Sequence, residues 1–573
     1  MESIALLFVI GVLIVIGGSW LAPRIRMAAP VLLVLVGVAC SYIPGMEPIE
    51  IEPEWILVVV LPPILYAAAV NVPVTDFRRN IRAISGLSVV LVIVSALGIG
   101  FLLSWLLPGL PLAAAIALGA VVAPPDAVAA TSIGKRLGLP ERLVTVLEGE
   151  GLVNDATALV LLRSAIAAVG GSVTLWEVAG DFAYAVVVAI AVGLVVGLVT
   201  VWARSRIGQP TLTTAISFTV PFLAFLPAEA IHASGVLSVV VAGLVTGYKS
   251  ARHLSAQDRI SERMNWRTIQ LLLENGVFLV MGFQFSHIIE VVEEDHLSVW
   301  GAVGLGLLVT LALLIMRGLF MIPLVLSLRA QQRGAQRRID RVDAFLERAD
   351  AFEGTLAPER EARLATFRDR VGRRRGEWEA LASEGLGWRG SAVLTWSGMR
   401  GVVTLAAAQT LPAGISFRPQ LILIAFTVAI TTLVVYGSTL PLIIRLLKVF
   451  GTDQNTREGE IRDLVQVIVD AGAAELRNPE LVRADGGVYD PDEIAVVVEN
   501  RARLAHNYWE LRQSNPSDRV AQSAALFRIM VEAEHIALID ARASGNYSAS
   551  AIEVAQMVID TDLARMNQGG SIG

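Results

Sequence analysis

Long apolar runs separated by short polar stretches dominate the first 450 residues of the chain. An α-helix needs about 20 predominantly apolar residues to cross the hydrocarbon core of a bilayer. Runs of that order predict thirteen membrane-spanning helices, at about 3–22, 27–43, 55–72, 83–107, 110–131, 143–169, 177–203, 211–226, 229–248, 268–290, 298–327, 391–411 and 419–447. The expected fold class is therefore all-α, a polytopic membrane protein.

Two longer polar segments interrupt or follow these runs. The segment 328–388 has apolar residues at helical spacing on two charged stretches, which predicts a short helical hairpin. For its arginines Arg373, Arg374 and Arg375, a solvated charged face is favoured over contact with anionic lipid. The segment 451–573 shows soluble composition, helical periodicity and no catalytic motif. We therefore expect a transmembrane domain at 1–450 with an insert at about 328–388, and a cytoplasmic helical tail domain at 451–573, for regulation, assembly or stability.

The loops between the predicted spans alternate in charge. Those after odd-numbered helices carry the Lys and Arg residues, whereas those after even-numbered helices are nearly free of them, Arg418 being the exception. Basic residues near helix ends stay in the cytoplasm. The alternation places the N-terminus outside and the C-terminus in the cytoplasm, in a multi-pass protein of the plasma (inner) membrane.

Composition agrees with this interpretation. Of 573 residues, 54% are hydrophobic and only 17% charged, at a mean hydropathy of +0.63. A soluble globular chain of this length carries far more charge. Cys40 is the one cysteine, which excludes an intramolecular disulfide and a cysteine-based zinc site.

Charged residues nevertheless occur inside the predicted spans. A charge at mid-bilayer costs about 2.5–3.5 kcal/mol on insertion scales, so such residues pair, face water or perform a function. The charges concerned are Asp126, Glu148, Glu150, Asp155, Arg163, Glu274, Arg317 and Arg400. For Arg163, a place in an outer funnel and a carboxylate partner are equally acceptable interpretations.

Two of these spans should be broken helices. Pro124 and Pro125 remove two amide donors just before Asp126, and Gly398 and Gly401 flank Arg400 in the twelfth span. Interrupted helices at corresponding places in inverted halves are the best sequence indication of a transporter's substrate site. We therefore expect an ion site between two broken crossing helices within inverted repeats.

The sixth span carries Glu150-Gly151-Leu152-Val153-Asn154-Asp155. At 100° per residue Glu150 and Asn154 share a face, while Asp155 is turned about 140° from Glu150. Glu150 can thus pair with an arginine while Asp155 faces a cavity. There its carboxylate can bind a monovalent cation or a proton in competition.

With these motifs the chain resembles the monovalent cation:proton antiporter family of the NhaP and sodium/hydrogen exchanger type, bacterial branch. The family pattern Glu-Ser-Leu-x-Asn-Asp is nearly reproduced by Glu150–Asp155. Three further segments resemble other signatures of the family: Leu61–Tyr66, Glu274 with Val277-Phe278 and Met281-Gly282, and Gly398–Gly401. The resemblance covers residues 1–450 in order and includes the thirteen-helix topology.

The resemblance implies roles for individual residues. Asp155 would be the cation- and proton-binding carboxylate, Asp126 would shape the site, and Asn154 would steady the break next to Asp126. Glu150 would pair with Arg317, and Arg400 would lie at the break in the twelfth helix. The asparagine before Asp155 implies one cation exchanged for one proton, hence electroneutral transport.

The resemblance further implies alternating access, a homodimer, and no cofactor besides the transported Na+, Li+ or K+ and H+. The partners are the ions and the lipid bilayer, with no nucleic acid and no enzymatic reaction. Two departures leave the cation open, because Pro125 and Gly151 stand where the family has Thr and Ser, and so remove two side-chain oxygens. Na+ or Li+ is the first expectation and K+ the alternative.

Two other classes fit the residues less well. A gated cation channel needs a continuous polar pore, but the charges here form one asymmetric cluster. A membrane-embedded hydrolase needs grouped catalytic residues, yet His232 and His287 stand alone in their spans.

Overall fold

The computed structural model describes residues 2–25, 27–43, 52–170, 175–294, 298–350, 387–450, 454–478, 480–483, 486–501, 518–544 and 547–568. Within these residues the elements are helical, apart from an isolated antiparallel bridge between Val482 and Val488. The all-α fold expected from the apolar runs is confirmed.

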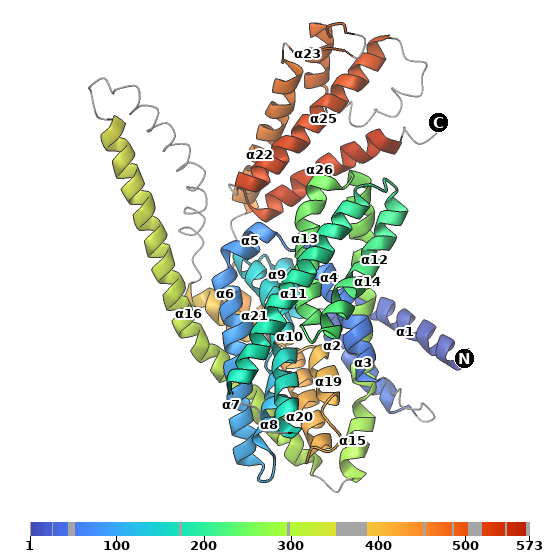
Figure 1. The fold of residues 1–573 in the computed structure, drawn as a ribbon, viewed down its shortest axis with the longest axis vertical. Helices are drawn as coiled ribbons and strands as arrows, with labels where there is room; N and C mark the ends of the chain where they lie inside the picture. The colour runs from blue at the N-terminus through green and yellow to red at the C-terminus, as the bar shows by residue number, and fades with distance from the viewer. Residues whose placement is uncertain are drawn as a thin grey trace.

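Helices of the first 450 residues form one bundle (Figure 1). They are α1 (Glu2–Leu21), α2 (Ala29–Ser41), α3 (Pro53–Trp55), η1 (Ile56–Val60, a π-helical turn), α4 (Leu61–Asn71), α5 (Val74–Arg79), α6 (Ile81–Ser85), η2 (Gly86–Val90, π-helical), α7 (Leu91–Leu106), α8 (Leu112–Val122), α9 (Ala127–Leu137), α10 (Glu141–Gly170), α11 (Leu175–Arg204), α12 (Pro210–Ala230), α13 (Gly235–His253), α14 (Ala256–Phe283), α15 (Phe285–Glu294), α16 (Val299–Asp350), α18 (Trp388–Trp396), α19 (Val402–Gln409), α20 (Arg418–Thr431), η3 (Thr432–Tyr436, π-helical) and α21 (Gly437–Leu447).

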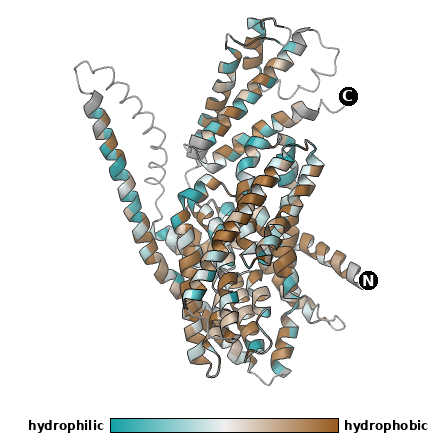
Figure 2. Ribbon diagram, in the orientation of Figure 1, coloured by the Kyte–Doolittle hydropathy of each residue, from teal (hydrophilic) through white to brown (hydrophobic). Residues whose placement is uncertain are grey.

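Every predicted span falls on a helix or on consecutive helices of this bundle. In the described residues, eight helical stretches are long and apolar enough to cross a membrane, and Leu6–Leu21, Ala29–Ser41 and Ile56–Asn71 are shorter apolar helices. Figure 2 shows the apolar residues concentrated in this bundle. The chain is therefore a multi-pass membrane protein.

Two apolar cores meet at α10. One is built mainly by α7, α8, α16 and the helices from α18 to α21. The other is built by α4 and the helices from α11 to α13. Residues of α10 belong to both, such as Leu162 in the first and Leu152 in the second. The helix that carries Asp155 thus lies between the two halves of the bundle.

The structure corrects one boundary. The sequence predicts a span ending near 327 and a separate helical hairpin from 328, whereas α16 continues unbroken from Val299 to Asp350. Nothing stops the helix at 328, because no proline follows there and the only glycine of the stretch 328–350 is Gly334. The second half of the predicted hairpin lies outside the described residues.

Residues after 453 form a separate helical unit at one end of the bundle (Figure 1). Its helices are α22 (Gln454–Leu476), α23 (Pro491–Glu499), α25 (Asp518–Ser544) and α26 (Ala549–Gln568). They share an apolar core that includes Leu464, Phe527 and Ile559. The unit contacts α14 through Asp560 of α26, which forms a buried ion pair with Arg259.

Candidate functional site: a carboxylate-lined cavity at two broken helices

The first break separates α8 from α9. The two prolines follow Val122 and Ala123, so α8 ends, and α9 begins at Ala127. Asp126 is the N-cap of α9, and its Oδ1 accepts a hydrogen bond from the backbone N–H of Val128 at 2.8 Å. A carboxylate at a helix N-terminus is also stabilised by the helix dipole.

The second break, between α18 and α19, crosses the first. Its residue Met399 accepts a hydrogen bond at its carbonyl from the backbone N–H of Asp126, at 2.6 Å. A side chain at Gly401 would have its Cβ only 2.7 Å from the Cβ of Asp126, so only glycine lets the two broken segments approach this closely. Both breaks are predicted from the sequence, and in the structure they contact each other.

Arg400 lies buried at this crossing. Its Nε donates to the carbonyl of Val122 at 2.9 Å, its guanidinium also donates to the carbonyl of Gly398, and its backbone N–H donates to Thr432 Oγ1 at 2.9 Å. Val122 is the last residue of α8, where the carbonyls lack helical partners and carry partial negative charge. The arginine therefore neutralises the end of a half-helix inside the bundle.

Asn154 and Asp155 face this crossing from α10. The Nδ2 of Asn154 donates to the carbonyl of Pro125 at 2.6 Å, and its Oδ1 accepts from the backbone N–H of Asp155. Asn154 is fully buried, whereas Asp155 is only partly covered. In the described part of the chain, no group donates a hydrogen bond to the Asp155 carboxylate.

Glu150 and Arg317 form a buried ion pair one turn away. Arg317 Nη2 lies 2.8 Å from Glu150 Oε2, its Nη1 contacts Oε1, and its Nε donates to the carbonyl of Leu394. Both side chains are at most 4% exposed. The pair therefore links α10 to α16 and α18 without facing the carboxylate of Asp155.

A cavity of about 670 Å³ opens at Asp155. Its deep lining includes Asp126 and Glu274 of α14, whose Oε1 accepts a hydrogen bond from Gln270 at 2.6 Å. Its outer lining comes from the end of α9, the first half of α14 and Glu553 of α26. The cavity therefore opens on the side of the bundle that carries the C-terminal unit.

Glu274 is the site residue that the sequence analysis did not assign. Glu274 stands out in the sequence as a charge in an apolar span, but helical periodicity gives no reason to place α14 opposite α10. Within the described residues no group of three or more His, Cys, Asp or Glu is arranged to hold a metal ion.

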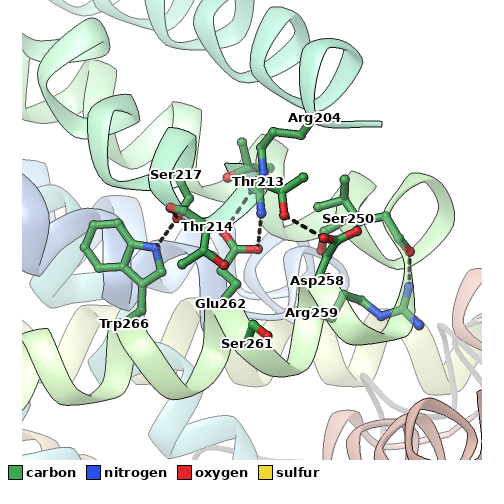
Figure 3. A network of polar contacts seen from close by, with 12 residues as sticks. Arg204, Thr213, Thr214, Ser217, Ser250, Asp258, Arg259, Ser261, Glu262 and Trp266 are labelled. Carbon is green, nitrogen blue, oxygen red and sulfur yellow. Dashed lines mark hydrogen bonds and ion pairs between the residues drawn. The ribbon is translucent and has the colours of Figure 1, made fainter. Parts of the chain in front are cut away.

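A polar network holds α14 in place (Figure 3). Arg204 of α11 forms a bidentate buried ion pair with Glu262, at 3.0 and 2.7 Å. The hydroxyl of Thr213 donates to Asp258 at 2.6 Å, and the indole of Trp266 donates to Ser217. These bonds tie the first three turns of α14 to α11 and α12, and so fix the helix that presents Glu274.

The opposite side of the bundle is bridged by a charge pair. Arg163, near the far end of α10, forms an ion pair with Glu229 of α12. The other oxygen of Glu229 accepts a hydrogen bond from the backbone N–H of Gly235 at 2.9 Å. Of the two interpretations of Arg163, the structure supports the carboxylate partner.

Comparisons with known proteins agree with this architecture. The transmembrane model of the sodium/hydrogen exchanger family matches residues 10–446. The chain is 30% identical over 439 residues to an uncharacterized Na(+)/H(+) exchanger of Mycobacterium bovis, covering 75% of this chain and 72% of that protein. It is 30% identical over 310 residues to a sodium, potassium, lithium and rubidium/H(+) antiporter of Bacillus subtilis, covering 51% and 45%.

Among solved structures, the sodium proton antiporter of Methanocaldococcus jannaschii at pH 8 matches with a TM-score of 0.55 at 17% identity. The match covers 78% of this chain and all of that one. At this identity the likeness concerns the fold.

Proposed function

Because the chain belongs to the sodium/hydrogen exchanger family, we propose that it exchanges one monovalent cation for one proton by alternating access. Its fold and its relatives are those of cation:proton antiporters. We infer the ion-binding residues, the stoichiometry and the preferred cation from the geometry of the site.

The observation that carries the proposal is that Asp155 lines a cavity of about 670 Å³. Its carboxylate accepts no hydrogen bond from the described residues, so both oxygens are available to a cation or a proton. Asp126 lines the same cavity and has one oxygen engaged in capping α9. We assign Asp155 as the exchanging carboxylate and Asp126 as the residue that shapes the site.

One carboxylate that binds either ion, but not both, transfers one charge in each direction. Asn154 is neutral and its amide is occupied by Pro125 and by the backbone of Asp155. It therefore positions Asp155 and does not exchange protons itself. The expected exchange is electroneutral.

The preferred cation in this proposal is Na+ or Li+. Backbone carbonyls and water must replace the hydroxyls that Pro125 and Gly151 lack, and such a shell discriminates less between ions. K+/H+ exchange by the same mechanism is the second candidate. It is favoured by the relative in Bacillus subtilis, which is named for sodium, potassium, lithium and rubidium.

The cavity and the Arg163–Glu229 pair suggest which state the structure represents. The cavity is lined by residues of α14 and by Glu553 of the C-terminal unit, while the Arg163–Glu229 pair joins α10 to α12 near the other end of α10. With the loop charges, we propose that the open side is the cytoplasm, that the N-terminus is outside, and that the protein lies in the plasma membrane as a homodimer.

Proton flux in proteoliposomes tests the function. Adding Na+, Li+ or K+ in turn should alkalinise or acidify the lumen with at least one ion, at a rate independent of membrane voltage. Asp155→Asn should abolish this flux while the protein elutes as a folded particle. Glu148→Gln, on the same helix at the cavity mouth, serves as the control and should keep most activity.

Absence of flux with all three ions would reject antiport, and full activity of Asp155→Asn would reject the assigned carboxylate. A voltage-dependent rate would reject only electroneutrality.

A further inference from the structure

The membrane-spanning part of α16 turns one apolar face away from the bundle. Ile315, Leu319, Ile322 and Leu326 are 52%, 61%, 58% and 59% exposed, and they recur at the spacing of one helix face. In a protein that crosses a bilayer, such a face contacts lipid.

The same face becomes basic where α16 leaves the apolar region. Arg329, Arg333 and Arg337 are exposed and follow Leu326 at spacings of three, four and four residues. At about 100° per residue they lie within about 40° of the direction of Ile315. Among the described residues none of the three guanidinium groups has a carboxylate partner.

The height of these arginines matches the headgroup region. At 1.5 Å per residue Arg329 lies about 4.5 Å, Arg333 about 10.5 Å and Arg337 about 16.5 Å beyond Leu326 along the helix. The headgroup layer adds about 5–8 Å on each side of the hydrocarbon core, and the Debye length at physiological salt is about 8 Å. Measured along the helix, Arg329 therefore lies within the headgroup layer, Arg333 just beyond it, and Arg337 about one Debye length from it.

The orientation of the helix brings them closer still. Figure 1 shows α16 leaving the bundle obliquely. Because the helix leans away from the bundle, we infer that the side facing away from the bundle is the side nearer the membrane surface. The acidic residues of this extension come later: Asp340, on the same face, is bonded to Gln336, and Asp343 and Glu347 follow. The charge is basic next to the membrane and mixed farther away.

We propose that Arg329, Arg333 and Arg337 form a binding surface for anionic lipid headgroups, the guanidinium groups donating to lipid phosphate. A lipid is the expected occupant because the apolar face below the three arginines is itself covered by acyl chains, which places headgroups directly against them. Guanidinium is well suited to this because it binds phosphate oxygens in a bidentate manner.

The test is a lipid titration of the purified full-length protein, followed by native mass spectrometry. Wild type should retain phosphatidylglycerol in preference to phosphatidylcholine, and this preference should fall as salt rises. Arg333→Gln should weaken retention about fivefold, the factor expected for one arginine near an anionic surface. Arg338→Gln is the matched control, because Arg338 is also exposed but turned about 100° from Arg337 and about 140° from Arg333.

Equal retention of both lipids by wild type would overturn the proposal, as would equal effects of Arg333→Gln and Arg338→Gln. Loss of a dimer in R329Q/R333Q/R337Q, with lipid retention unchanged, would assign the surface to a second copy of the chain instead. The transport assay is not involved, so failure here leaves the proposed function untouched.

Discussion

Glu150→Gln removes the negative partner of a buried arginine. The guanidinium of Arg317 keeps its bond to the carbonyl of Leu394, but its charge is no longer neutralised. Side-chain exposures of 1% for Glu150 and 4% for Arg317 leave no room for water to compensate. Breaking a buried pair in this way typically costs about 3–5 kcal/mol.

Such a loss is large for this protein. The free energy of unfolding of a folded domain is about 5–15 kcal/mol, so the change removes roughly a fifth or more of it. The measurement is the midpoint of thermal unfolding in detergent, together with the yield of monodisperse protein.

A second charge pair, between Glu148 of the same helix and Lys135 of α9, provides the control. Lys135 Nζ lies 2.6 Å from Glu148 Oε1, but the side chains are 63% and 22% exposed. Exposed pairs contribute about 0–1 kcal/mol, so Glu148→Gln should shift the midpoint little. Glu150→Gln should therefore lower the midpoint more than Glu148→Gln, because the two pairs differ in burial although both contacts are short.

The effects of substituting the two partners, Glu150 and Arg317, should be coupled. In E150Q/R317Q the unpaired charge is gone, so the double variant should be less damaged than the sum of the single variants, by roughly 0.5–3 kcal/mol. Additive effects of the two substitutions, or an equal loss in Glu148→Gln, would refute the argument from burial.

Three further predictions concern the crossing and the C-terminal unit. Gly401→Ala should abolish transport and lower the yield, because its Cβ has no space at the crossing, whereas Gly276→Ala on α14 meets open space and should be neutral in the same assays. Asp560→Asn should expose residues 454–568 to limited proteolysis, because it leaves Arg259 buried without its charged partner. Burial, and then the neighbouring Arg259, lower the pKa of His535 below its ordinary value near 6.5. Protonation therefore favours the detached unit, so proteolysis should increase as pH falls below about 6.5, and His535→Gln should remove this dependence.

Contacts between distant segments explain one departure from the family pattern. Gly151 stands where the family pattern has serine, and Ala127 follows Asp126 at the start of α9. In the structure these two positions touch: a Cβ on Gly151 would lie 2.5 Å from the Cβ of Ala127. A serine at 151 would therefore collide with the start of α9, against which α10 packs. A local sequence pattern does not show this contact.

The sequence by itself determined the helices, the two breaks and the charges that matter. The length of each apolar run predicts a span because a bilayer has a nearly fixed thickness. Prolines predict breaks because they lack a backbone N–H donor, and glycines because they readily adopt non-helical backbone angles. These are local properties, so Asp126, Asp155 and Arg400 could be singled out without coordinates.

Only the tertiary structure decided what these residues face. Glu274 joins the cavity because α14 packs opposite α10, and Arg259 meets Asp560 across about 300 positions of chain. Pairings of this kind depend on which helix surfaces bury each other. That is a property of the whole bundle, because periodicity gives the direction of a side chain around its own helix but not the neighbour it meets.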